Sequence, residues 1–193
     1  MIRSLQPGLS RDLALRTLSP PWPFGVLRRW TKGKVLGMAE IYIPYRLYKA
    51  NVECRGKRSI RFLAVDATSG TLDPYEFSDD NLQARCIDVE TRNCLPVRLI
   101  EAKTHILALE QVRRLLFSKG IFLSGTPMIT AEITGTEFYV PYWAGFFGHE
   151  HNVTVLMLNA IRGTIEGNKI AGLVKAWLME QPDDCLAAAR VNT

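Results

Sequence analysis

Two matching segments, near residues 40–72 and 137–165, constrain the fold of this chain more than any other feature. The sequences IYIPY and VDATSGTL in the first segment match FYVPY and LNAIRGTI, in the same order, in the second. Because the order is preserved, we interpret the two segments as copies of one unit. The residues that define the motif are Tyr42, Pro44, Tyr45, Asp66 and Gly70 in the first copy, and Tyr139, Pro141, Tyr142, Asn159 and Gly163 in the second.

Each copy has the pattern of a β-hairpin. Runs rich in β-branched and aromatic residues stand on either side of a short polar loop. The predicted strands are residues 41–54 and 59–65 in the first copy and 138–147 and 153–158 in the second, with loops at 55–58 and 148–152. Proline cannot donate a main-chain hydrogen bond to a neighbouring strand, so we expect Pro44 and Pro141 at an edge or a bulge.

The same turn sequence, Asp/Asn-Ala-x-x-Gly, follows the second strand of each copy. An oxygen of its first side chain can accept hydrogen bonds from nearby main-chain N–H groups, and its glycine permits a positive φ. We therefore predict that Asp66 and Asn159 organise the two turns and that Gly70 and Gly163 have positive φ. The four motif tyrosines could form a paired aromatic site, but we favour a packing role, since strands select aromatic residues for packing.

A helix is expected in each half of the chain. Periodicity predicts helices over residues 97–118 and 166–180 and strands over 121–123 and 128–134, whereas 73–93 is polar and is expected to be a loop. The predicted fold class is α+β: one compact domain made of two β-hairpin-plus-helix halves, with a basic N-terminal arm. The predicted boundaries are 1–36 for the arm, 37–125 for the first half, 126–183 for the second half and 184–193 for a flexible tail.

The predicted arm is basic and aromatic. Ser10 can cap a short helix over residues 11–18, and the prolines that follow favour an extended chain. Residues 1–61 carry 13 Lys or Arg and 3 acidic residues, a net charge of +10, whereas residues 62–193 carry 11 and 16, a net charge of −5. This asymmetry suggests an anionic partner or mutual attraction between the two parts. The candidate partner-binding residues are Trp22, Phe24, Arg28, Arg29, Trp30, Lys32 and Lys34.

Two resemblances bear on the repeated segments. The hairpin that ends in VDATSGTL resembles the second half of a PepSY-type module, in which a helix precedes a hairpin whose last strand ends in a Val-Asp-Ala-x-x-Gly turn. The Tyr-x-Pro-Tyr elements are similar to a family of uncharacterised bacterial proteins with paired Tyr-x-Pro-Tyr hairpins. PepSY-type modules are associated with inhibition or regulation of partner proteins, so this resemblance implies regulatory binding and not catalysis.

Sequence motifs for catalysis and cofactor binding are missing. There is no Gly-x-Ser-x-Gly motif, Walker loop or Rossmann fingerprint. His149 and His151 could share a metal ion, but they fall in a predicted loop and His105 is the only other histidine. A zinc site needs three or four protein ligands, so we predict no metal site, and we assign no catalytic residue and no cofactor.

The compartment expected from the sequence is the cytoplasm. The four cysteines form no Cys-x-x-Cys pair, which is typical of reduced thiols in a cytosolic protein: Cys54, Cys86, Cys94 and Cys185. Charged residues interrupt the first 20 residues, so we expect no secretory signal, and no apolar run is long enough for a transmembrane helix.

The function expected from these observations is a non-enzymatic binding or regulatory protein that acts through protein–protein contacts. One alternative is a binder of nucleic acid or another anionic surface that uses the basic arm, whose binding would weaken with salt. The other alternative is a small enzyme with a site between the two halves. The sequence leaves both alternatives open, and it does not predict an oligomeric state.

Overall fold

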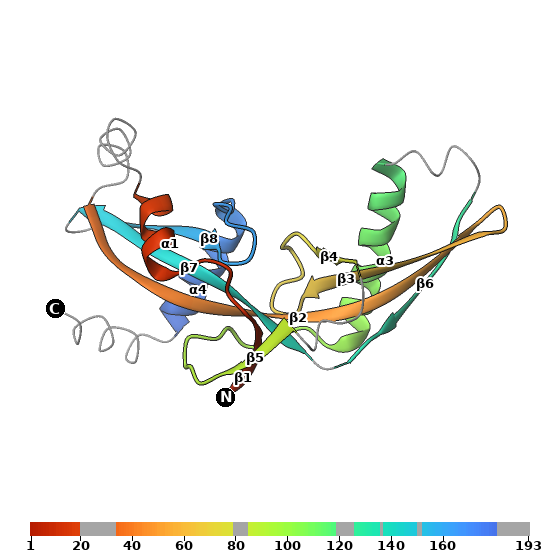
Figure 1. Ribbon diagram of the computed structural model, residues 1–193, viewed down its shortest axis with the longest axis horizontal. Helices are drawn as coiled ribbons and strands as arrows, with labels where there is room; N and C mark the ends of the chain where they lie inside the picture. Colours follow the sequence, from red (N-terminus) through yellow and green to blue (C-terminus); the bar gives the residue numbers. More distant parts are fainter. Residues whose placement is uncertain (20–33, 79–84, 119–125, 136, 150–151, 181–193) are drawn as a thin grey trace. The chain divides into compact units, whose positions relative to one another are not determined.

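The computed structural model describes residues 1–19, 34–78, 85–118, 126–135, 137–149 and 152–180 of the chain. Within these ranges it has three α-helices and a mixed sheet of eight strands (Figure 1), which confirms the predicted α+β class. None of the helices in these ranges is long and apolar enough to cross a membrane. Several predictions fall outside the described residues: the strand at 121–123, the tail, and the arm between residues 20 and 33.

The chain forms two compact units whose segments alternate along the sequence. Unit 1 contains Met1–Leu5, Ile43–Thr91 and Pro96–Tyr139, and unit 2 contains Gln6–Tyr42, Arg92–Leu95 and Val140–Thr193. Two long strands, β2 (Lys34–Cys54) and β7 (Phe138–His149), contribute residues to both units. In each of them the change of unit falls within the Tyr-x-Pro-Tyr motif, immediately after Tyr42 and immediately after Tyr139.

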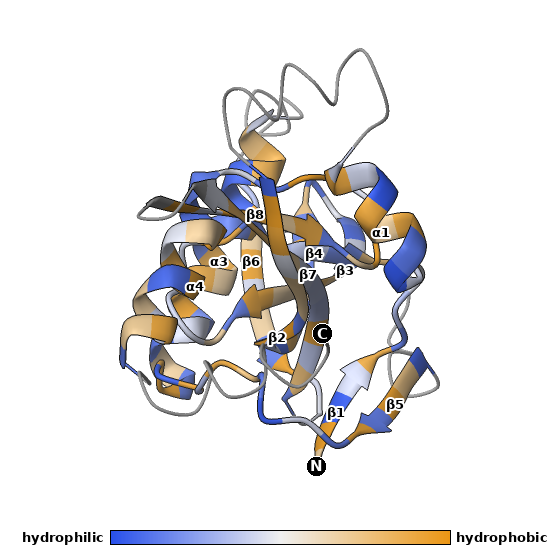
Figure 2. Ribbon diagram, turned by 90° about the vertical axis from the view of Figure 1, so that its left-hand side faces the viewer, coloured by the Kyte–Doolittle hydropathy of each residue, from blue (hydrophilic) through white to orange (hydrophobic). Residues whose placement is uncertain are grey.

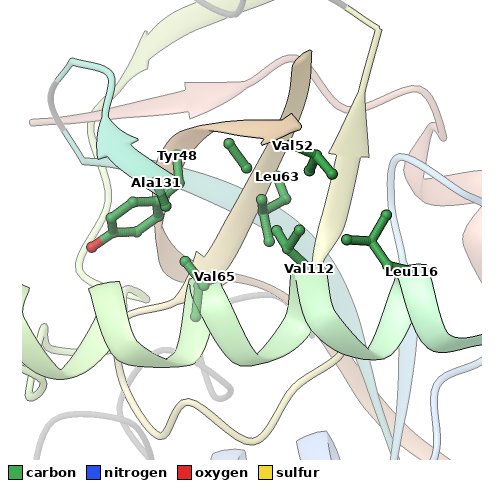
Figure 3. Packing of buried hydrophobic residues seen from close by; sticks show 9 residues of the cluster. Tyr48, Val52, Leu63, Val65, Val112, Leu116 and Ala131 are labelled. Atoms are coloured by element: carbon green, nitrogen blue, oxygen red, sulfur yellow. The ribbon is translucent and has the colours of Figure 1, made fainter. Parts of the chain in front are cut away.

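The core of unit 1 is a sheet covered on one face by helix α3 (Glu101–Ser118). Strand β2 lies between β3 (Lys57–Asp66) and β6 (Met128–Ile133), and β4 (Tyr75–Phe77) extends the sheet beyond β3. Alternate residues of each strand point toward the helix, because successive side chains of a strand lie on opposite faces. The buried cluster that results (Figure 3) contains Tyr48, Ala50, Val52, Leu63, Val65, Ala108, Val112, Leu116 and Ala131.

Unit 2 contains the second hairpin and two helices. Strand β7 pairs with β8 (Asn152–Asn159) in antiparallel register, from Tyr142 opposite Asn159 to His149 opposite Asn152. Ser10 is the N-cap of helix α1 (Arg11–Leu18), as predicted, and its hydroxyl accepts a hydrogen bond from Leu13 N. Helix α4 (Asn168–Glu180) buries one apolar stripe, and Figure 2 shows hydrophobic and hydrophilic residues along it. The buried cluster contains Ala14, Leu18, Trp143, Phe147, Leu156, Leu158 and Ala160.

Three short strands lie where the sequence predicts none. Strand β1 (Ile2–Leu5) belongs to the region expected to be an arm, and it pairs with β5 (Cys86–Val89) in antiparallel register and with β7 at Tyr139 in parallel. Both β4 and β5 lie within the predicted loop 73–93. The loop prediction is therefore wrong for these residues. Strands of three or four residues show little alternation, and their pairing depends on partners far away in the sequence.

Both hairpins have longer strands than predicted. In the first, the turn is only Arg55–Gly56, and both residues have positive φ, at 50° and 73°. A two-residue turn of this kind matches the twist of the strands, so Lys57 and Arg58 belong to β3 and not to a loop. In the second, β7 continues to His149 and β8 begins at Asn152, so the predicted loop 148–152 is also too long.

Both predicted helices after the hairpins begin later than expected. The N–H groups of Arg98 and Leu99 donate to the carbonyl of Ala67, which holds this segment on the turn and delays α3 until Glu101. Similarly, Glu166 N donates to Met157 O, and α4 begins at Asn168. Both helices continue as far as Ser118 and Glu180, as predicted, and the residues that follow lie outside the described ranges.

Candidate functional site

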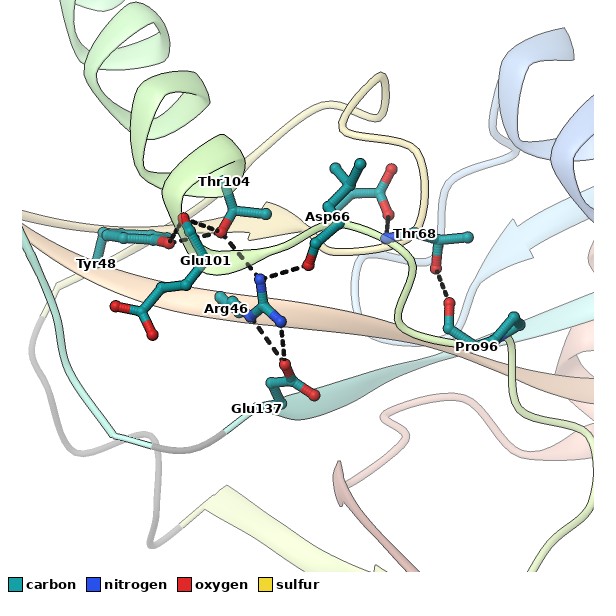
Figure 4. Close-up of polar contacts among 9 residues, drawn as sticks. Arg46, Tyr48, Asp66, Thr68, Pro96, Glu101, Thr104 and Glu137 are labelled. Carbon is teal, nitrogen blue, oxygen red and sulfur yellow. Dashed lines mark hydrogen bonds and ion pairs between the residues drawn. The ribbon is translucent and has the colours of Figure 1, made fainter.

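The turn of the first motif is organised by the side chain of Asp66, which is fully buried (Figure 4). Its Oδ1 accepts hydrogen bonds from Thr68 N at 2.7 Å and from Ser69 N at 3.2 Å. Ala67 N donates to Pro44 O at 2.9 Å, and Gly70 has a φ of 69°. Pro44 precedes Tyr45, the first residue of β2 that pairs with β3, and it contributes only its carbonyl oxygen as an acceptor. The N–H group that proline lacks is therefore not needed for the pairing of the two strands.

The turn of the second motif has the same local hydrogen bonds. Asn159 Oδ1 accepts from Ile161 N and Arg162 N, both at 3.0 Å. Ala160 N donates to Pro141 O at 3.1 Å, and the φ of Gly163 is also 69°. The prediction of a positive φ at both glycines is confirmed. An acid and an amide thus perform the same task, because both offer an oxygen to the main chain.

The motif tyrosines lie in packed surroundings. Tyr42, Tyr45 and Tyr142 are buried. The ring of Tyr45 meets Tyr75 edge-on with centroids 5.3 Å apart and lies 6.3 Å from Phe138. Burial, with a smaller effect of Glu40, raises the pKa of Tyr42 well above its usual range. These tyrosines have the surroundings of core residues and not of an exposed recognition site.

Unit 1 also contains a buried polar network that no sequence motif predicts (Figure 4). Arg46 Nε donates to Glu137 Oε1 at 2.8 Å, and its Nη2 pairs with the same oxygen. Its Nη1 donates to Leu99 O at 2.7 Å and to Thr104 Oγ1 at 3.2 Å. Tyr48 Oη and Thr104 Oγ1 are 2.7 Å apart, and burial raises the pKa of Tyr48.

This network connects β2, α3 and the segment before β7, but its chemistry is structural. The guanidinium of Arg46 is neutralised and held by several acceptors, and the phenol of Tyr48 stays protonated at neutral pH. Neither group is positioned as a base beside a nucleophile. No sequence signal marks the network, because Trp143 takes the place of Arg46 in the second copy of the motif.

The outward face of α3 combines exposed apolar and basic side chains. Ile106 and Phe117 are 57% and 75% exposed. On the same side of the helix the exposed charged residues are Lys103, Glu110, Arg113 and Arg114, whereas Glu101, which is also exposed, lies on another side of the first turn. Its opposite face is buried every fourth residue, at Thr104, Ala108, Val112 and Leu116. The inner face of α3 is therefore packed in the core of unit 1, whereas its outer face exposes both large apolar and charged side chains.

The predicted partner-binding residues are almost all outside the described ranges: Trp22, Phe24, Arg28, Arg29, Trp30 and Lys32. Lys34, the remaining one, is exposed at the first residue of β2. Among the described residues, no group of three or more His, Cys, Asp or Glu side chains could hold a metal ion. His105 Nε2 lies 2.8 Å from Ala131 O, and the cysteines in the described ranges, Cys54, Cys86 and Cys94, are free thiols.

Comparison with known proteins finds no family model, no curated protein and no solved structure that matches this chain.

Proposed function

We propose that this chain is a non-enzymatic, cytoplasmic binding protein that contacts a protein partner through the outward face of α3. The observation that supports the proposal best is the exposure of Ile106 and Phe117 on a helix whose inner face already has its core. Single exposed apolar residues are ordinary on a protein surface, but two on one helix face form a basis for recognition.

The spacing of the two residues places them on one line. They are 11 residues apart, which corresponds to about three turns of helix and about 16 Å along its axis. Glu110 and Arg113 lie between them on the same side of the helix. This arrangement resembles the anchors of a helix that lies in a partner's groove, with apolar contacts near both ends and charge between them.

The charge of this face indicates the chemistry of the partner. Lys103, Arg113 and Arg114 outnumber Glu110, the acidic residue beside them. A partner with an apolar groove and acidic residues at its rim would complement the face and exclude basic surfaces.

The test is affinity capture of partners from native-host cells with the full chain and with Ile106→Ser and Phe117→Ser. The matched control is Leu36→Ser, because Leu36 is 56% exposed on β2 in unit 2. Loss of an interface anchor costs about 1.4 kcal/mol or more, so each α3 variant should lose about tenfold in affinity for the captured protein. Equal loss in the Leu36 variant, with all variants folded by circular dichroism, would contradict the proposal.

A further inference from the structure

We infer that the outer edge of β3, from Lys57 to Arg61, receives an extended acidic peptide of a partner as an additional strand. This surface lies on the sheet of unit 1 and is separate from the outward face of α3. The edge of β3 would bind the peptide through main-chain hydrogen bonds, whereas α3 would contact its partner through side chains.

The direction of the main-chain groups of β3 follows from its register. Ala67 N donates to Pro44 O, so odd-numbered residues of β3 form hydrogen bonds with β2. In an antiparallel pair these residues alternate with residues whose N–H and C=O point away from the partner. The main-chain N–H and C=O groups of the even-numbered residues of β3 therefore point away from β2. On that side, Phe62 and Ala64 pair with β4.

The remaining outward residues are Arg58 and Ile60. Pairing with β4 ends at Phe62, and no other strand of the described ranges pairs with β3 between Lys57 and Arg61. The hairpin extends beyond the end of β4 (Figure 1), and residues 57–60 are exposed. Within the described part of the chain, the edge thus leaves two N–H donors and two C=O acceptors for an incoming strand.

The charge of the edge selects the occupant. Lys57, Arg58 and Arg61 lie on the strand, and Arg55 lies in the turn beside it. Arg58 pairs with Glu53 at 2.9 Å but its side chain is still 82% exposed. Two copies of this edge would place like charges opposite each other, which disfavours pairing with a second copy. An acidic strand would instead place carboxylates beside these bases.

Arg61 adds a specific unsatisfied group to this edge. Its Nε is buried and has no hydrogen-bond partner within the described part of the chain. The carboxylate of Glu76 lies 3.9 Å from its Nη1, beyond hydrogen-bond distance. The Arg61 side chain is 24% exposed, so a carboxylate from an added strand could pair with the accessible part of its guanidinium and offset the cost of the enclosed Nε. Arg58 and Arg61 point to opposite faces of β3, so an added strand with its carboxylates on one face pairs with one of these two bases.

The test uses a seven-residue peptide that alternates Glu with Val, capped at both ends, and water-exchange NMR of the full chain. At nine-tenths occupancy the exchange of the Arg58 and Ile60 amides should slow about tenfold, whereas Ser59 and Arg61, already bonded to β2, should not change. A peptide with Pro in place of Val should give no protection, because proline lacks the N–H of a strand.

Two variants separate this inference from the proposed function. Arg58→Glu should weaken the peptide effect at least about tenfold, whereas Ile106→Ser on α3 should leave it intact. Lys103→Glu, the same charge reversal on α3, serves as the control for net charge. The inference is wrong if the amides stay unprotected at saturating peptide, or if an oligonucleotide binds the hairpin more tightly than the acidic peptide does.

Discussion

The turns of the two units are alike, but the residues around them differ. Two residues after the motif proline, unit 1 has Arg46 in a buried polar network, whereas unit 2 has Trp143, which donates from Nε1 to Leu9 O. Four residues after it, unit 1 has Tyr48, whereas unit 2 has Gly145. A Cβ at Gly145 would lie 2.8 Å from Phe147 Cε2 and 3.0 Å from Leu18 Cδ1, so the glycine makes room for the Phe147 ring and for α1.

This difference shows that the turn motif is independent of what packs on the hairpin. The same main-chain hydrogen bonds form beside a charged network and beside an apolar cluster. The motif therefore accounts for the turn in each unit, and we look for function in the features that the two units do not share. In unit 1 these features are the outward face of α3 and the basic edge of β3.

The largest expected effect concerns the buried arginine of unit 1. Arg46→Leu should destabilise the protein by about 3 kcal/mol, because it leaves the partly buried Glu137 carboxylate and the Leu99 carbonyl without their donor. Arg58→Leu removes an exposed ion pair and should cost less than about 1 kcal/mol. Urea denaturation of the two variants measures the difference. Equal midpoints would show that the network of unit 1 contributes no more than a surface pair.

The two turn glycines should differ in their response to alanine. Both have a φ of 69°, so each substitution should cost about 1 kcal/mol from the left-handed backbone. The Cβ of Gly70→Ala would also overlap Leu107 Cδ1, whereas at Gly163 the nearest atom, Leu9 Cδ1, is 3.3 Å away. We expect Gly70→Ala to cost about 1 kcal/mol more than Gly163→Ala. Thermal melting tests this order, and the reverse order would contradict the turn geometry described above.

Exchange of the acid and the amide should be asymmetric. Asn159 Nδ2 donates to Glu166 Oε1 at 2.9 Å, so Asn159→Asp places two carboxylates together in a buried site and should cost about 2 kcal/mol. Asp66→Asn keeps the Oδ1 acceptor but replaces Oδ2, which accepts from Ser69 N and Oγ, with an NH2 group that cannot accept, and it should cost about 1 kcal/mol. Addition of Glu166→Gln to Asn159→Asp should restore most of the loss. If the double variant does not recover stability, repulsion by Glu166 is not the cause of the loss in Asn159→Asp.

The smallest effect is a pH dependence from Tyr48. Burial raises its pKa in the folded protein, so the protonated phenol stabilises the fold below about pH 10, and this contribution is lost as the pH rises further. Between about pH 9 and 11, the stability of the Tyr48→Phe variant should therefore fall by less than that of the wild type. The variant lacks the hydrogen bond to Thr104 and should be less stable than the wild type at lower pH. Urea midpoints across this range test the sign. Parallel curves for the two proteins would contradict it.

The sequence predicts those parts of the fold that depend on local interactions. The Ser10 cap and the positive φ of Gly70 and Gly163 follow from short-range chemistry, and all three are confirmed. The late start of α3 could not be predicted, because it depends on the carbonyl of Ala67, about 30 residues away. Strands β1, β4 and β5 depend in the same way on distant partners.

The candidate site was even less accessible to sequence reasoning. Arg46 and Glu137 are 91 residues apart, and nothing in either local sequence links them. The exposed face of α3 is hidden in the sequence for another reason: the apolar periodicity that predicts the helix does not show which apolar residues stay outside. Ile106 and Leu109 fit the apolar pattern of the helix equally well, but Leu109 packs against the core whereas Ile106 is exposed. The superposition of the two repeated segments, with Pro44 on Pro141, stays a prediction.

Site-specific photocrosslinking in native-host cells tests the central claim, that unit 1 meets the partner, most directly. A benzophenone amino acid replaces Ile106 in one strain and Leu36 in another, two apolar residues of nearly equal exposure in different units. The account predicts a discrete crosslinked protein at position 106, which disappears when Arg113 and Arg114 are changed to Glu, and none at position 36. Crosslinks to the same protein at position 36, with none at position 106, would contradict it.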